Sequence, residues 1–201
     1  MKKTALRQQL SKLKDFNNPK ASLEQYSTPP ELAADMVHSA FMKGDLGEGS
    51  KVVDPGTGTG ILAIGAALTG STVVAVEKDP EALETARENA KDAGVWKRID
   101  FREMDVSGLK ESFDTCVMNP PFSVHSEEGE KFFSKAFDIS DAVYSIVYEG
   151  RTSEVDRILK NSEHRLEESQ KYTVSLPPTQ VFHTEEGHDT ELRLILTRKA
   201  D

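Results

Sequence analysis

The sequence is poor in cysteine and has no long apolar run. Cys116 is its only cysteine, and a single thiol cannot form an internal disulfide, which excludes a small secreted domain held by disulfides. We therefore expect Cys116 to be a small buried hydrophobe. No apolar segment approaches the roughly 18 residues of a membrane span, and residues 1–4 lead into a polar stretch unlike the apolar core of a signal peptide. These absences predict a cytoplasmic protein that does not cross a membrane.

Positive charge is also scarce. The chain carries 25 lysines and arginines against 34 acidic residues, a net charge of −9, which argues against a protein that grips nucleic acid over its whole surface. Residues 1–20 differ, because they hold six basic side chains and one acidic and so carry about +5, which leaves about −14 on the remainder. Two interpretations stay open: a positive segment that attracts phosphates, or the solvated face of an amphipathic helix. The six basic residues are Lys2, Lys3, Arg7, Lys12, Lys14 and Lys20.

The pattern of apolar residues indicates a single α/β domain over residues 1–201. A chain of 201 residues with 37% hydrophobic residues is long enough to bury a sizeable core. Strands and helices alternate from residue 51 onward, and the last two strands have no helix between them. The pattern predicts a Rossmann-like, doubly wound, seven-stranded, mostly parallel sheet with an antiparallel C-terminal strand pair. The predicted strands are 51–54, 72–76, 99–102, 113–118, 142–147, 164–176 and 191–197.

Several helices have recognisable signals at their ends. Leucines at helical spacing predict an amphipathic helix over 3–14, and residues 1–42 as a whole are expected to form a helical cap over a ligand site. Thr28, with Glu31 three residues later, matches a capping box, and Thr152 is a candidate cap for a later helix. The polar stretch 123–130 is a candidate lid. Further helices are predicted over 61–68, 79–93, 131–139 and 153–161.

A glycine loop joins the first predicted strand to a helix of small residues. Asp54 ends the strand, and Gly56, Gly58 and Gly60 follow at alternate positions. Such glycines let the backbone approach a nucleotide ligand above a helix amino terminus. The spacing is not that of the dinucleotide fingerprint, and no lysine follows the glycines, which excludes a P-loop. We therefore expect a nucleotide-like ligand at this loop.

Acidic residues follow the next two predicted strands. Glu77 ends the second strand, 23 residues after Asp54, and a carboxylate at about that interval typically holds a ribose diol. Asp105 stands in a loop a few residues beyond the third strand. Both positions lie at the sheet edge where open α/β sheets bind their ligands.

The fourth predicted strand runs into Asn119-Pro120-Pro121-Phe122, where two prolines forbid its continuation. This loop offers an amide, outward backbone carbonyls and an aromatic ring at the ligand edge of the sheet. The Asn119 side-chain oxygen and the Pro120 carbonyl can each accept a hydrogen bond from an exocyclic amine, while Phe122 stacks on the ring that bears it. The loop therefore suits a planar amine as substrate.

Taken in order, Asp54, the glycines, Glu77, Asp105 and the Asn-Pro-Pro-Phe loop resemble the class I S-adenosylmethionine-dependent methyltransferases that act on exocyclic or amide nitrogens. That resemblance implies that Asp54, the three glycines and Asn119 contact the cofactor, with the glycine loop packed on its methionine part. It also implies that Glu77 binds the ribose hydroxyls, that Asp105 contacts the adenine amine, and that the Asn119 loop holds the target nitrogen beside the cofactor. No metal is implied.

A closer resemblance, over nearly the whole chain, is to the methyltransferase-like protein 5 family. It rests on residues 23–28 (Leu-Glu-Gln-Tyr-Ser-Thr), the Asn-Pro-Pro-Phe loop, residues 142–145 and residues 176–178 with 182–183. It implies N6 methylation of an adenosine in small-subunit ribosomal RNA, with Gln25, Tyr26 and Thr28 lining the cofactor site and Lys20 near the substrate strand. It also implies a heterodimer with a small zinc-containing activator protein. The sequence departs from the family at Pro55, at 123–124 and in the acidic loop 184–186.

Two other functions stay open at this point. A glutamine-N5 protein methyltransferase would present an amide nitrogen to the same loop, although Phe122 replaces its usual tyrosine; a binding module that keeps the fold as a scaffold is the other. His183 and His188 fit a solvated hairpin better than a metal site. Trp96 is interpreted as a packing residue. No general base is assigned, because positioning and polarisation suffice for transfer to an amine.

Overall fold

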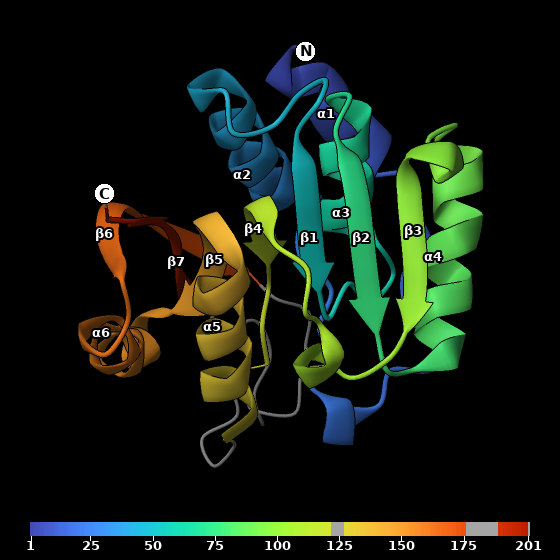
Figure 1. Ribbon diagram of the computed structural model, residues 1–201. Helices are drawn as coiled ribbons and strands as arrows, with labels where there is room; N and C mark the ends of the chain where they lie inside the picture. Colours follow the sequence, from blue (N-terminus) through green and yellow to red (C-terminus); the bar gives the residue numbers. More distant parts are fainter. Residues whose placement is uncertain (122–126, 176–188, 201) are drawn as a thin grey trace.

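The computed structural model describes residues 1–121, 127–175 and 189–200. In them, seven strands form one sheet in the order β3-β2-β1-β4-β5-β7-β6, with helices on both faces (Figure 1). The strands are β1 (Lys51–Pro55), β2 (Thr72–Glu77), β3 (Ile99–Glu103), β4 (Phe113–Met118), β5 (Ser140–Tyr148), β6 (His164–Ser175) and β7 (Asp189–Lys199). The helices are α1 (Lys3–Leu10), α2 (Pro30–Lys43), α3 (Ile61–Leu68), α4 (Pro80–Asp92), α5 (Glu127–Ile139) and α6 (Thr152–Lys160).

The sheet is parallel from β3 to β5 and antiparallel at its other end, where β7 pairs with both β5 and β6. This arrangement confirms the predicted fold class. The chain winds outward from β1 toward β3 and then from β4 toward β6, so the winding direction reverses between β1 and β4. A crevice at the carboxyl ends of two such strands is where doubly wound folds bind ligands.

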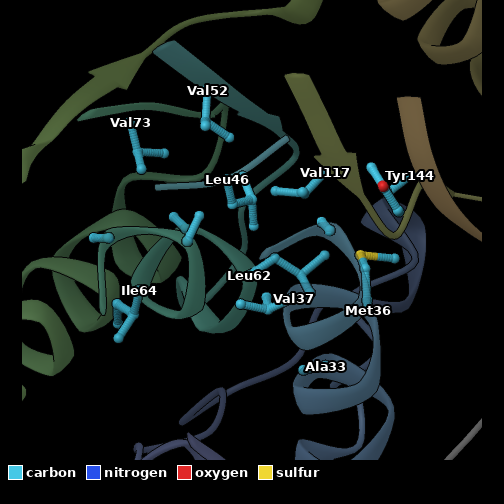
Figure 2. Packing of buried hydrophobic residues seen from close by; sticks show 14 of the residues in the cluster. Ala33, Met36, Val37, Leu46, Val52, Leu62, Ile64, Val73, Val117 and Tyr144 are labelled. Atoms are coloured by element: carbon cyan, nitrogen blue, oxygen red, sulfur yellow. The ribbon is translucent and has the colours of Figure 1, made fainter. Parts of the chain in front are cut away.

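Each face of the sheet is covered by its own apolar layer. Helices α1 to α4 cover one face, where Met36 of α2 and Leu62 of α3 lie close to Val117 of the sheet (Figure 2). Helices α5 and α6 cover the other face, where Phe133 of α5 packs with Val143 of β5. Strands covered on both faces are apolar on both sides, which is the pattern seen in the sequence of β1, β2 and β4.

Helix α1 ends at Leu10, four residues before the predicted end at residue 14. The reason is a tertiary contact. Asn89 of α4, which is 1% exposed, accepts a hydrogen bond from the Lys14 N–H (2.8 Å) and donates one to the Lys14 carbonyl (2.9 Å). Both backbone groups of Lys14 are therefore occupied by α4, and the chain leaves the helical path.

Two predicted helix caps are wrong. Pro29 occupies the cap position of α2 without a side-chain bond, and the Thr28 hydroxyl instead faces Asn119. Thr152 lies inside α6, and its hydroxyl donates to the Glu149 carbonyl. Asp79 does cap α4, because its carboxylate accepts from the Glu81 N–H. Residues 127–130 of the candidate lid belong to α5, and its first residues, 123–126, lie outside the described part of the chain.

Two predictions about single residues have opposite outcomes. Cys116 is a buried free thiol, as expected. Trp96 is not a packing residue, because 52% of its surface is exposed. Over the described ranges, no helix is both long and apolar enough to span a bilayer.

His164 is a buried histidine at the start of β6. Its ring is 1% exposed and stacks on Phe137 with a centroid separation of 4.7 Å. Nε2 lies 3.0 Å from the Ser140 carbonyl, which only accepts, so Nε2 carries the proton and Nδ1 accepts from the Thr197 hydroxyl. Burial lowers the pKa of His164 from its ordinary value. The ring is therefore held neutral.

This neutral histidine predicts acid sensitivity. A histidine with a lower pKa in the folded than in the unfolded chain binds protons more tightly when unfolded, so its contribution to stability is complete above about pH 6.5 and is lost as the pH falls below that value. The unfolding free energy should fall on acidification from pH 7 to 5, and His164→Gln should flatten that dependence. Denaturant titrations at each pH measure it, with His38→Gln as control. If the His164→Gln variant keeps the same pH dependence of the unfolding free energy, other groups cause the acid sensitivity.

Candidate active site

A cleft opens at the carboxyl ends of β1, β2 and β4, beneath residues 16–28. It encloses about 950 Å³ when its open mouth is included. Of the ten residues predicted to bind a cofactor, nine border this cleft: Gln25, Tyr26, Thr28, Asp54, Gly56, Gly58, Glu77, Asp105 and Asn119. Gly60 is not among them. Of the predicted catalytic loop, Asn119 and Pro121 border the cleft, Pro120 does not, and Phe122 lies outside the described residues.

The glycine loop is covered by two aromatic rings. Gly56 and Gly58 have φ of +70° and +55°, a region that favours glycine. A Cβ added at Gly56 would lie 2.9 Å from the Phe132 ring, and one at Gly58 would lie 2.9 Å from the Phe16 ring. Both rings border the cleft. Sequence reasoning missed them, because Phe132 matches the apolar face of α5 and Phe16 belongs to no motif.

Gly60 has a different role. It precedes α3 with φ +89°, and a Cβ there would lie 3.1 Å from the Cβ of Ala86 in α4. The third glycine therefore permits the close packing of α3 on α4 and does not border the cleft.

Asp54 ties the glycine loop to the first turn of α3. It is 1% exposed, and its Oδ2 accepts from the Thr57 hydroxyl (2.7 Å) and from the Ala63 N–H (2.9 Å). Burial, opposed by these two hydrogen bonds, raises the pKa of Asp54 to about 7. Ionisation of Asp54 near neutral pH is therefore favoured by any positive group that enters the cleft.

Glu77 holds the loop from the end of β2. Its Oε2 accepts from the Gly58 N–H (3.0 Å), and its Oε1 accepts from the N–H groups of Lys78 (2.9 Å) and Asp79 (3.0 Å). Three backbone donors fix this carboxylate, and Oε2, which accepts only one of them, has a further lone pair for a ligand hydroxyl.

Asp105 lies across the cleft against α5. The Lys131 ammonium lies 2.8 Å from its Oδ1, and the Ser107 N–H donates to the same oxygen at 2.9 Å. These contacts, Lys131 foremost, hold the pKa of Asp105 well below its ordinary value. Asp105 is therefore a permanently charged hydrogen-bond acceptor at the cleft wall.

Residues 15–28, which we call the strap, cross the cleft and are anchored on Asp79. This carboxylate is 4% exposed and accepts from Lys20 Nζ (2.7 Å) and from Gln25 Nε2 (2.6 Å). Gln25 Oε1 in turn accepts from the Lys20 N–H at 2.7 Å. Lys20 thus lies on the Asp79 side of the site, and Gln25 contributes to the anchor as well as to the cleft wall. Sequence reasoning identified Asp79 only as the start of a helix.

Asn119 stands at the carboxyl end of β4, at the other end of the strap. Its Nδ2 donates to the Thr28 hydroxyl at 3.0 Å. No histidine is among the described residues that border the cleft. In the part of the chain that the structure describes, no group of three or more His, Cys, Asp or Glu side chains is arranged to hold a metal ion. The described residues of the site therefore offer positioned polar groups and no histidine base.

Comparison with known proteins agrees with this geometry. The model of the family described as the methyltransferase small domain matches residues 33–174, more than half of the chain. The chain belongs to the methyltransferase small-domain family.

Two known proteins resemble the chain over nearly its full length, and a third shares its fold. The zebrafish (Danio rerio) protein METTL5, an rRNA N(6)-adenosine-methyltransferase, is 32% identical over 97% of this chain and 98% of its own. PH1948 from Pyrococcus horikoshii, provisionally classed as an RNA methyltransferase, is 32% identical, with a TM-score of 0.90 over 100% of this chain and 99% of its own. The Synechocystis magnesium protoporphyrin IX methyltransferase, solved with bound SAM, shares the fold at 16% identity, with a TM-score of 0.67 over 84% and 78% of the two chains.

The anchor on Asp79 predicts local stability of the strap. Lys20→Met removes the ammonium that donates to the Asp79 carboxylate. Because the strap then loses one of its anchoring hydrogen bonds, local opening should become easier, and amide hydrogen exchange across residues 20–28 should become severalfold faster. Lys12→Met is the matched control, since Lys12 is exposed and forms no ion pair with any described residue. Exchange measured by mass spectrometry tests this. Equal exchange in the two variants would show that Gln25 alone suffices.

Proposed function

We propose that this protein transfers a methyl group from S-adenosylmethionine to the exocyclic N6 of an adenosine in small-subunit ribosomal RNA. The observation that carries the proposal is the position of Asn119, at the end of β4 and on the border of the cleft that the glycine loop forms. The full-length similarity to METTL5 supports the substrate class.

The residues of the cleft fit this cofactor. The described cleft residues include five carboxyl groups but only one ammonium, that of Lys78. A sulfonium with an amino group therefore meets complementary charge. Glycines 56 and 58 present backbone without a Cβ, and in the proposal Glu77 accepts from the ribose hydroxyls and Asp105 from the adenine amine. When bound, the cofactor supplies an electrophilic methyl group; the chain supplies orientation.

Asn119 and Pro120 act on the acceptor. The Asn119 side-chain oxygen and the Pro120 carbonyl each accept a hydrogen bond from one N–H group of the adenosine amine. These hydrogen bonds draw the lone pair of the amine nitrogen out of conjugation and toward the methyl group. The proton leaves to water after transfer, so the absence of a histidine from the described cleft residues is no obstacle. The proposal assigns to Phe122 the role of stacking on the adenine ring. The base must be unpaired, because a paired amine is unreachable.

Labelled-methyl transfer tests the substrate class. The protein should label total RNA and not total protein, and the label should map to an adenosine of the small-subunit rRNA. Label in large-subunit rRNA would contradict the finer assignment. Label in protein would favour a glutamine-N5 methyltransferase. No transfer to either would favour a binding module.

Asn119→Ala should lower kcat by about two orders of magnitude while cofactor affinity is retained, because one oriented acceptor in such a site contributes roughly 3 kcal/mol in the transition state. Glu77→Ala is the contrasting variant: its hydrogen bonds are the same in ground and transition states, so cofactor affinity should fall first. Calorimetric titration and single-turnover kinetics separate the two effects. An Asn119→Ala enzyme with parental kcat would exclude the polarisation mechanism.

The charge distribution supports a partner. Four of the six basic side chains in residues 1–20 pair with acidic groups of the body: Lys3 with Asp35, Arg7 with Glu31, Lys14 with Glu88 and Lys20 with Asp79. Leu6 and Leu10 of α1 are 1% exposed, so this helix is a packing element. Little of its charge is left for phosphates, and the attraction for RNA must come from elsewhere.

The proposal therefore includes a small zinc-containing activator protein. The exposed Trp96 lies three residues before β3, which is an edge strand of the sheet, and such an edge suits a protein partner. Co-expression with the activator should give a heterodimer with a raised melting temperature, and Trp96→Ser should weaken it. Met42→Ser is the matched control, because Met42 is 68% exposed at the end of α2. A complex equally sensitive to both variants would place the interface elsewhere.

A further inference from the structure

Thr28 is buried, but its hydroxyl does not cap the helix that follows. It is 7% exposed, and α2 begins at Pro30 without a side-chain cap. The hydroxyl instead accepts the Asn119 amide N–H at 3.0 Å, a contact between residues 91 apart in the sequence. A buried polar side chain kept at such a position needs a partner, and the partner here is the residue placed to act on the acceptor.

This hydrogen bond occupies the nitrogen end of the Asn119 amide. An asparagine side chain has one accepting and one donating end. Because Nδ2 donates to Thr28, Oδ1 is turned away from Thr28 and stays available as an acceptor. An acceptor amine presents N–H donors, so the opposite orientation would set donor against donor and leave the lone pair in conjugation.

The surroundings of Thr28 hold it in place. Pro29 and Pro30 follow it and restrict the backbone, and Leu32 of α2 is 1% exposed. Before it, the strap is anchored on Asp79 through Lys20 and Gln25. Thr28 is thus held on both sides along the chain, which keeps the hydroxyl position preorganised.

Asn119 lies between two recesses. It borders the cleft, and it also borders a smaller recess lined by Tyr148, Leu192 and residues of the strap. Thr28 borders only the cleft. The amide therefore stands where a methyl donor in the cleft and an acceptor from the other side would meet.

We propose that Thr28 is a positioning residue that sets the orientation of the Asn119 amide, so that Oδ1 and not Nδ2 faces the acceptor amine. This inference rests on the proposed function and gives the strap a role in turnover.

Three variants test it. Thr28→Val is nearly isosteric and removes the acceptor, Thr28→Ser keeps it, and Thr28→Ala is a second deletion of the hydroxyl should the valine not fold. Thr28→Val should lower kcat roughly tenfold, the effect of one neutral hydrogen bond in an active site. KM for RNA and the Kd for the cofactor should stay within about twofold. Thr28→Ser should restore most of the rate.

A double-mutant cycle distinguishes a positioning role for Thr28 from a merely structural one. In the Asn119→Ala background, Thr28→Val should have no further effect on the residual rate, because the group that it positions is gone. Parental kcat in Thr28→Val would overturn the proposal. So would an equal loss in both backgrounds, or a loss confined to cofactor affinity.

The outcome is separable from that of the proposed function. The ratio of variant to parental rate is measured on whichever substrate the parent methylates, RNA or protein. Methylation of protein with a tenfold loss in Thr28→Val would overturn the RNA assignment and keep the role of Thr28. A parent that methylates neither overturns both.

Discussion

The site depends on the capture of backbone N–H groups by buried carboxylates at the ends of parallel strands. The glycine loop turns back on itself, and its donors need acceptors away from water. Glu77 accepts from the N–H groups of Gly58, Lys78 and Asp79. Asp54 joins the loop to α3. One of those donors belongs to Asp79, whose own carboxylate then anchors the strap. A continuous set of contacts thus runs from the end of β2 to Asn119.

The elements that the sequence predicted correctly are those whose signals are local. The strand, glycine loop and helix from residue 51 to 68 follow from apolar runs and glycine spacing, and the antiparallel C-terminal pair from two strands without a helix between them. The features it did not predict are long-range contacts. The end of α1 depends on Asn89, the anchor of the strap on Asp79, and the partner of Thr28 on Asn119. In each of these, the partner is a side chain far away in sequence, which a local motif does not predict.

Most of the basic side chains in residues 1–20 form ion pairs within the molecule. The basic amino-terminal segment, which by composition could bind phosphates, packs through α1 and pairs with acidic side chains of α2 and α4. Exposed ion pairs of this kind contribute little to stability individually. They do neutralise the segment, and they explain why a local excess of charge in a sequence is a weak guide to a nucleic-acid surface.

The place of β7 in the sheet also constrains how the molecule is made. This strand follows every other element in the chain, yet it lies between β5 and β6. During synthesis, β1 to β5 can assemble as they emerge, but the β5 edge stays open and β6 has no neighbour until β7 leaves the ribosome. Closure of this half of the sheet therefore waits for β7, and until then the nascent chain exposes an apolar strand edge of the kind that chaperones cover.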